Sequence, residues 1–122
     1  TQVAAAATCR RTPKEGRRLG MGADYGFGWN PHGDYARALT FFVKYVGFTP
    51  LETIMCATKT GAEIMGRGSE FGTVAAGKFA DLLIVDGDVA ANISLLEDRT
   101  RFIAVMQGGL VKAGQLAQPV GV

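Results

Sequence analysis

Residues 17–24 read Arg-Arg-Leu-Gly-Met-Gly-Ala-Asp, a short strand-like run that stops in a glycine-rich loop. At the two-residue period of a β-strand, Leu19, Met21 and Ala23 share one face, while Gly20, Gly22 and Asp24 fall on the other. Such a face fits the crowded interior of a closed parallel barrel, in which the carboxyl ends of the strands carry the chemistry. The run therefore predicts a barrel strand over residues 18–23, with Asp24 at its functional end.

Two interpretations of Asp24 stay open from the residues alone. A carboxylate at the end of a barrel strand is a candidate metal ligand or general base, whereas an aspartate in a loop commonly caps a turn. The loop that follows, residues 25–33, reads Tyr-Gly-Phe-Gly-Trp-Asn-Pro-His-Gly. Its aromatic side chains either line a pocket or pin the loop to the protein body.

The composition argues against several classes of protein. The chain has 122 residues, of which 48% are hydrophobic, enough for one domain with a modest core and too many for a disordered chain. A net charge of +2 gives little reason to expect a nucleic-acid partner, and no apolar stretch reaches the roughly 20 residues of a membrane span. Cys9 and Cys56 lack metal-ligand spacing, and the first residues do not resemble a signal peptide. We therefore expect a cytoplasmic protein that binds neither nucleic acid nor membranes.

Two helices are predicted in the middle of the chain. Residues 35–46 carry an apolar stripe at helical spacing, with Asp34 as N-cap and Gly47 as the stop. The second helix begins at residues 49–52, Thr-Pro-Leu-Glu, where threonine is the cap, proline takes the first helical position and glutamate completes a capping box. It ends at Gly66. Its predicted inner face consists of Leu51, Ile54, Met55, Thr58, Ala62 and Met65.

The last third of the chain is predicted to be β-structure. Residues 82–85, Leu-Leu-Ile-Val, are apolar on both faces, which predicts a strand that is buried on both sides. Residues 101–107 and 110–112 flank a Gly-Gly pair at 108–109, a strong two-residue hairpin signal. The Asp-Gly-Asp sequence at 86–88 is interpreted as a turn, and its aspartates as turn formers and not ligands.

Five short motifs follow one another in the sequence. They are Gly-Ala-Asp at 22–24, His-Gly-Asp at 32–34, Thr-Pro-Leu-Glu at 49–52 with Ala-Thr at 57–58, Gly-Thr-Val-Ala-Ala-Gly-Lys-Phe-Ala-Asp-Leu at 72–82, and Val-Met-Gln-Gly-Gly-Leu-Val at 105–111. In this order they resemble the C-terminal end of a metal-dependent amidohydrolase, of the imidazolonepropionase-like and prolidase-like branch. The resemblance implies an α/β fold that is incomplete: the last strand and outer helices of a TIM-type barrel in residues 1–70, then part of a small β-sandwich in residues 71–122.

The resemblance also implies roles for individual residues. In the family, the aspartate at the end of the last barrel strand lies beside one or two divalent metals, usually zinc, and passes a proton from water to the leaving group. Asp24 is therefore expected to be the catalytic residue and a metal ligand. His32, Tyr25 and Trp29 are expected to contact a small-molecule substrate at the pocket mouth. The complete enzyme is expected to hydrolyse a C–N bond of an amide, cyclic amide or dipeptide-like compound.

We expect the isolated chain to be catalytically incomplete. A catalytic zinc needs about three protein ligands, and the chain offers one histidine together with Asp24, without the family's other metal-binding residues. No bound cofactor and no activity are therefore expected of these 122 residues alone. The alternative is a non-catalytic α+β module that self-associates or completes a partner chain. Both interpretations predict a homo-oligomer or association with the missing part of the barrel.

Overall fold

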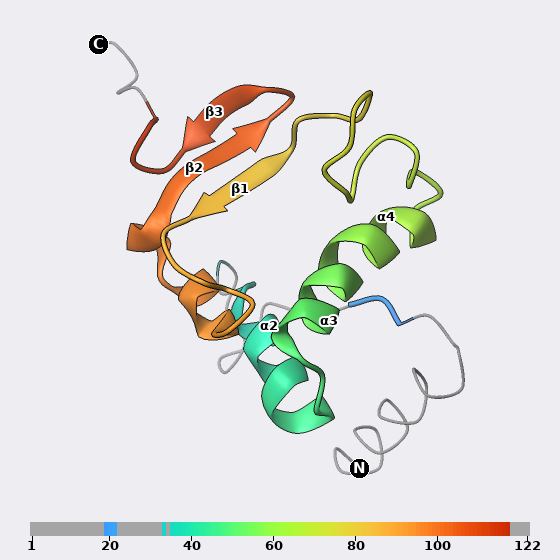
Figure 1. The fold of residues 1–122 in the computed structure, drawn as a ribbon, viewed down its shortest axis with the longest axis vertical. Helices are drawn as coiled ribbons and strands as arrows, with labels where there is room; N and C mark the ends of the chain where they lie inside the picture. The colour runs from blue at the N-terminus through green and yellow to red at the C-terminus, as the bar shows by residue number, and fades with distance from the viewer. Residues whose placement is uncertain (1–18, 22–32, 34, 118–122) are drawn as a thin grey trace.

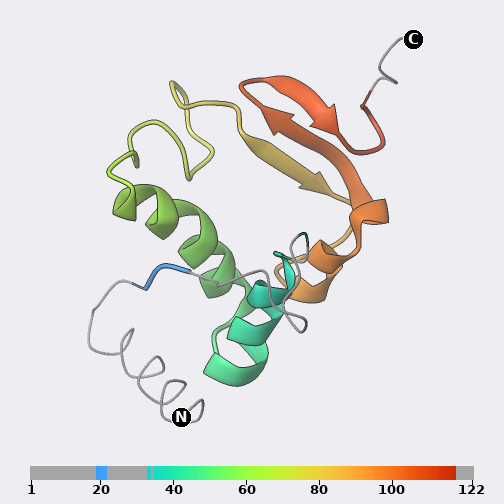
Figure 2. The same ribbon diagram turned by 180° about the vertical axis from the view of Figure 1, so that it is seen from behind.

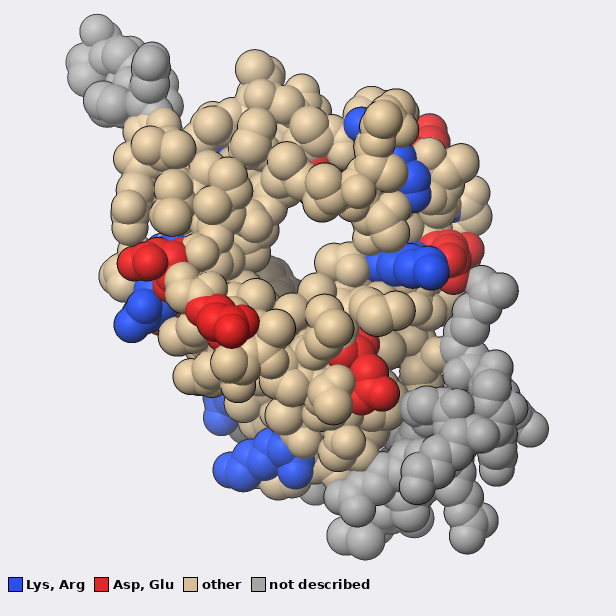
Figure 3. Space-filling model, viewed as in Figure 1, with Lys and Arg blue, Asp and Glu red and all other residues tan. Residues whose placement is uncertain are grey.

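The computed structural model describes residues 19–21, 33 and 35–117. In this part of the chain, helical segments come first and a three-stranded antiparallel sheet follows (Figure 1). Figure 2 shows from behind the irregular loop that leads from the last helix to the sheet. An opening that side chains do not fill separates the sheet from the longer helix in the space-filling view (Figure 3). The two halves therefore do not close over a common core.

The first helix consists of α2 (Arg37–Phe41) and a π-helical continuation, η1 (Phe42–Val46). Gly47 ends it with a φ of 82°, a left-handed conformation that glycine adopts without steric cost. The helix predicted over residues 35–46 is confirmed from its third residue onward. The predicted N-cap, Asp34, lies outside the described residues.

The second helix is continuous through α3 (Pro50–Met55), η2 (Cys56–Thr60) and α4 (Gly61–Ile64). The predicted capping box is confirmed at its start. Glu52 N donates to Thr49 Oγ1 over 3.2 Å, and Thr49 N donates to Glu52 Oε2 over 2.8 Å. These two bonds satisfy backbone donors that a helix start leaves without partners.

The predicted inner face of this helix is wrong in most of its members. Thr53 is fully buried and Ala62 is 4% exposed, whereas Leu51 and Met55 are 57% and 46% exposed. The reason is that the backbone at Gly72 lies close to this helix: a Cβ built on Gly72 would lie 2.6 Å from Ala62 Cβ. Small residues therefore take the covered side, and large apolar ones remain at the surface.

The sheet contains β1 (Leu82–Val85), β2 (Phe102–Gln107) and β3 (Leu110–Ala113) in the order β1-β2-β3. The predicted hairpin is confirmed. Gly108 and Gly109 connect β2 to β3 with φ of 57° and 81°, and positive φ at both central residues is the condition for a type I′ turn.

The prediction that β1 is buried on both sides is wrong. Leu83 and Ile84, which point to opposite faces, are 45% and 43% exposed. Within the sheet, Ala104 of the central strand is the one buried residue. Because β1 is apolar on both faces, its burial would need an element packed on each face of the sheet. The described helices lie beside the sheet and not across it (Figure 1).

The strand predicted over residues 18–23 is not formed in its described part. Residues 19–21 belong to no strand. A side chain placed on Gly20 would collide with that of Ile64, so this segment lies against the end of α4. A strand needs a neighbour to accept its backbone hydrogen bonds, and here the neighbouring element is a helix.

Two short 3₁₀ turns, which the sequence pattern did not predict, connect β1 to β2. They are η3 (Ile93–Glu97) and η4 (Arg99–Arg101), and the side chains of Asn92 and Asp98 cap them. Ile93 is 4% exposed, and η3 packs against α2. This segment is therefore the link between the sheet and the first helix.

Candidate functional site

The four predicted site residues lie outside the described part of the chain. They are Asp24, Tyr25, Trp29 and His32. The structure does describe the chain on either side of them, at residues 19–21 and at Gly33. The roles of these four residues therefore stay predictions. We call the segment that carries them, residues 22–33, the candidate loop.

The C-terminal end of the candidate loop is held by an arginine from a distant element. Arg99, in η4, donates a hydrogen bond from Nη2 to the carbonyl oxygen of Gly33. Gly33 has a φ of 98°, in the region that favours glycine. A Cβ at this position would lie 3.6 Å from the same nitrogen. The guanidinium therefore sits directly against the residue that follows His32.

The N-terminal approach to the candidate loop lies in a different place. Gly20 lies against Ile64, at the end of α4, with no room between them for a side chain. Gly20, which precedes the candidate loop, and Gly33, at its end, thus contact helix α4 and turn η4, which lie 35 residues apart in sequence when counted from Ile64 to Arg99.

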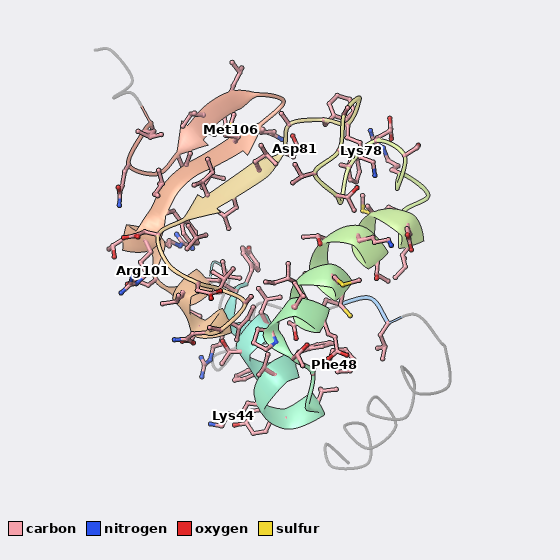
Figure 4. The ribbon with its side chains drawn as sticks, viewed as in Figure 1. Lys44, Phe48, Lys78, Asp81, Arg101 and Met106 are labelled. Carbon is pink, nitrogen blue, oxygen red and sulfur yellow. The ribbon has the colours of Figure 1, made fainter. Side chains whose placement is uncertain are left out.

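Two charged residues of the fourth motif have structural partners. Lys78 Nζ donates to Gly68 O and to Thr73 Oγ1, both over 2.6 Å. Asp81 Oδ1 accepts from Gly108 N over 2.7 Å, so this carboxylate supports the hairpin turn. Figure 4 shows Asp81 where the loop enters β1 and Lys78 further back along that loop. These bonds give both charged side chains a structural role.

Five described groups have shifted pKa values. The side-chain hydrogen bond between Arg67 and Glu70 raises the pKa of the arginine and lowers that of the glutamate, and the other three shifts also have local causes. Hydrogen bonds from the backbone N–H and then the hydroxyl of Thr49 lower the pKa of Glu52. Partial burial, followed by the charge of Glu52, raises the pKa of Cys56, which keeps this thiol protonated and unreactive. Hydrogen bonds from the hydroxyl and backbone N–H of Thr100 lower the pKa of Asp98. None of these shifts marks a catalytic acid or base.

The described residues do not assemble a metal site. Within residues 19–21, 33 and 35–117, no three His, Cys, Asp or Glu side chains come together to hold an ion. Asp88 Oδ1 instead accepts from Ala90 N over 3.0 Å and from Ala91 N over 3.2 Å, as a turn former does. Likewise, no helix in the described part is long and apolar enough to cross a membrane.

Sequence reasoning missed Arg99 as a residue next to the candidate loop. The sequence does contain a local signal for the two turns. The side chains of Asn92 and Asp98 each accept a hydrogen bond from the backbone N–H two residues further on, at Ser94 and Thr100. No local signal connects Arg99 to Gly33, because packing alone brings together residues that are 66 positions apart.

Comparison with known proteins relates most of the chain to one family. The sequence profile described as Amidohydrolase family matches residues 4–112. An imidazolonepropionase from Thermoanaerobacter pseudethanolicus is 29% identical over 80 residues, which cover 66% of this chain and 19% of the relative.

Solved structures agree in fold. A candidate prolidase from Bifidobacterium longum has a TM-score of 0.77 at 31% identity, covering 85% of this chain and 25% of that one. A Xaa-Pro dipeptidase with methionine bound in its active site has a TM-score of 0.76 at 28% identity, covering 89% and 25%. An A. niger ochratoxinase, at 24% identity and a TM-score of 0.77, is similar in fold, covering 93% and 25%. The chain thus spans 19% to 25% of the length of these relatives.

Proposed function

Because the chain belongs to the amidohydrolase family, we propose that it is part of a hydrolase that cleaves a C–N bond in a small molecule. The observation that carries this proposal is the family match over residues 4–112 together with TM-scores of 0.76 and 0.77 to prolidase-type structures. Relatives named imidazolonepropionase and Xaa-Pro dipeptidase favour a cyclic amide, amide or dipeptide-like substrate. The activity is proposed for a complete enzyme, since the chain spans 19% to 25% of these relatives.

We further propose that the chain contributes two parts to that enzyme. Residues 1–70 would supply the last strand and outer helices of a TIM-type barrel, and residues 71–122 would supply strands of a small β-sandwich. The division is supported by the described elements, because the helices end at Ile64 and the sheet begins at Leu82. Leu83 and Ile84, exposed on opposite faces of β1, are where further strands would add cover.

Asp24 is the proposed proton carrier of the reaction. Water attacks the carbonyl carbon of the substrate, and the Asp24 carboxylate takes a proton from that water. The C–N bond then breaks, and Asp24 returns the proton to the leaving nitrogen, so that an acid and an amine result. His32, Tyr25 and Trp29 would orient the substrate. The support for these roles is the position of the residues in the motifs at 22–24 and 32–34.

The residues of this chain do not fit a metal on their own. The sequence holds one histidine, and the described part assembles no group of three ligand side chains. A divalent ion, zinc in our proposal, would therefore need ligands from the rest of the enzyme, with Asp24 as this chain's contribution. We derive no step of the reaction from a metal held by this chain alone.

The test compares Asp24→Asn with Asp88→Asn in a complete enzyme that contains this chain. Asparagine keeps the shape of Asp24 but cannot accept the proton, so kcat for a hydrolysable dipeptide should fall by about 100- to 10,000-fold. Asp88→Asn should leave kcat unchanged, because an asparagine oxygen can accept the same turn hydrogen bonds. The isolated chain should show no amide hydrolysis and far less than one zinc per chain by elemental analysis. Full turnover in Asp24→Asn would contradict the proposal.

A second candidate function is a non-catalytic module that self-associates or completes a partner chain. The observation in its favour is the apolar surface on both halves of the molecule, with Leu51 57% exposed on the helix and Leu83 45% exposed on the sheet. Stoichiometric, chelator-resistant zinc and turnover that depends on Asp24 in the purified 122-residue chain would contradict this module and show a site completed between chains.

A further inference from the structure

We propose that the peptide between Asp86 and Gly87 isomerises spontaneously to isoaspartate, a form in which the main chain runs through the aspartate side chain. The product is a substrate for an enzyme that methylates isoaspartyl carboxylates. The site lies where the chain leaves β1, and both residues are exposed. The isomerisation needs only these two residues and water, so it proceeds whether or not the chain is part of a hydrolase.

The side-chain carboxylate of Asp86 is available for reaction. Within residues 19–21, 33 and 35–117, this carboxylate has no hydrogen bond and no ion pair. The other three aspartates of the described part each accept a hydrogen bond from a backbone N–H: Asp81 from Gly108, Asp88 from Ala90 and Ala91, and Asp98 from Thr100. Those carboxylates are held in turns, whereas that of Asp86 is free to rotate onto the peptide that follows it.

Gly87 supplies the attacking nitrogen. Its N–H donates to no acceptor in the described part of the chain. Glycine has no side chain to crowd the approach of a carboxyl carbon, and its φ of 130° lies in a region that other residues rarely adopt. At Asp88, by contrast, the next residue is Val89, whose branched side chain shields the amide nitrogen. Both reacting groups are therefore accessible at Asp86 and not at Asp88.

The reaction is intramolecular and passes through a succinimide ring. The Gly87 nitrogen attacks Cγ of the protonated Asp86 side chain, a C–N bond forms, and the acid hydroxyl leaves with the amide proton as water. A second water then adds to the main-chain carbonyl carbon of Asp86. The bond from this carbon to the Gly87 nitrogen breaks, and the nitrogen keeps the electron pair and takes a proton. The chain now runs through Cγ, and the former main-chain carbonyl is a free carboxylate.

Arg101 favours this direction of ring opening over the return to aspartate. Asp86 N donates to Arg101 O over 2.8 Å, and Arg101 Nη1 donates to Asp86 O over 3.3 Å. Figure 4 shows Arg101 near the end of β1. The oxygen that the guanidinium contacts belongs to the carbonyl that water attacks, so the cation stabilises the negative charge that develops there and remains on the product.

The product carries a group that the parent chain lacks, an exposed carboxylate on the main chain in place of the Asp86 carbonyl. An isoaspartyl methyltransferase recognises this group. The carboxylate oxygen takes the methyl group from the sulfonium of S-adenosylmethionine, and the sulfur keeps the electron pair of the broken C–S bond. The implied partner is thus a methyl-transferring enzyme that acts on aged copies of this chain.

The experiment incubates the purified 122-residue chain at pH 7 in ¹⁸O-labelled water and then digests it with trypsin in ordinary water. Cleavage after Lys78 and Arg99 releases residues 79–99, which contain all four aspartates of the described part. Fragment masses should place one ¹⁸O atom at Asp86 and none at the other three. An isomer of the same sequence should separate by chromatography and gain one labelled methyl group from S-adenosylmethionine and an isoaspartyl methyltransferase.

Asp86→Glu should lose the ¹⁸O label, because glutamate would have to close a larger ring, and the matched variant Asp88→Glu should keep the label at Asp86. Arg101→Met should lower the ratio of isoaspartate to aspartate among the labelled products, and Arg99→Met should leave this ratio unchanged. An unlabelled Asp86 after a time that labels the urea-unfolded chain, or equal labelling of Asp88, would overturn the proposed site. An isomer that takes no methyl group would overturn the proposed partner, and an unchanged ratio in Arg101→Met would overturn the role of the arginine.

Discussion

Thr40 and Thr53 both bury a hydroxyl in the helical half of the molecule, but their hydrogen bonding differs. Thr53 is fully buried, and its Oγ1 donates to Thr49 O over 3.0 Å. Thr40 Oγ1 is also buried and has no hydrogen-bond partner within the described residues. A buried hydroxyl without a partner costs stability, whereas one with a partner contributes to it.

We predict that Thr40→Val raises the free energy of unfolding by about 1 kcal/mol, because valine keeps the shape and removes the unpaired group. Thr53→Val should lower the free energy of unfolding by about 1 kcal/mol, because it removes a hydrogen bond from a buried site. Urea unfolding of the two variants beside the parent chain measures both effects. A Thr40→Val protein that is less stable than the parent would indicate a partner for this hydroxyl in residues that the structure does not describe.

At the scale of the element, the start of α3 couples stability to pH. The capping box lowers the pKa of Glu52, first through the backbone N–H of Thr49 and then through its hydroxyl. A carboxyl whose pKa is lower in the folded state contributes stability above its unfolded pKa, and this contribution is lost as pH falls through the folded value. The helix start should therefore weaken in acid.

The measurement is unfolding of the parent chain and Glu52→Gln at pH 7 and pH 3. The parent should lose more stability between these pH values than Glu52→Gln, which has no charge to lose. Thr49→Ala should cost about 1 kcal/mol at pH 7 and should return the pKa of Glu52 toward its ordinary value. Equal losses in the parent and Glu52→Gln would show that the carboxylate contributes nothing to the cap.

The same scale explains which predictions from sequence succeeded. The capping box joins Thr49 to Glu52, and the hairpin turn depends on Gly108 and Gly109, so their determinants lie within three residues of one another. The apolar run at residues 82–85 also located β1. The run does not show what covers each face, and for that reason the predicted burial of Leu83 was wrong, as was that of most of the second helix's predicted inner face.

Less of the candidate site could be predicted from the sequence. The motifs at 22–24 and 32–34 indicated a functional loop, and its residues lie outside the described part of the chain. The contact between Arg99 and Gly33 could not be predicted, because no periodic or capping pattern reports on residues 66 positions apart. Such a contact follows from the packing of η3 on α2, which is a property of the folded chain.

At the scale of the whole molecule, the sheet has two edges of different character. The strand order leaves β1 and β3 at the edges. Lys112 lies in β3, and a lysine on an edge strand discourages pairing with another chain. β1 reads Leu-Leu-Ile-Val and has no charge and no proline. β1 is therefore the edge that we expect to associate.

We predict that the purified chain forms a dimer or a higher oligomer through β1, and that Leu83→Lys shifts it toward the monomer. Leu116→Lys is the matched control, since Leu116 is also exposed, at 61%, but lies outside the strands. Light scattering at high micromolar concentration measures the molar mass of each. A compact monomer in the parent chain, or an equal effect of both substitutions, would contradict association through this edge.

The position of β2 between its two neighbours has a consequence for synthesis on the ribosome. β1 is complete at Val85, but its partner strand ends at Gln107. At a typical rate of translation, the residues between Val85 and Gln107 take roughly one to four seconds to add. During that interval β1 has emerged from the ribosome exit tunnel, while β2, its neighbour in the finished sheet, has not. Nascent chains of this protein should therefore be recognised by cellular chaperones at Leu82–Val85, and should be released once the hairpin has emerged.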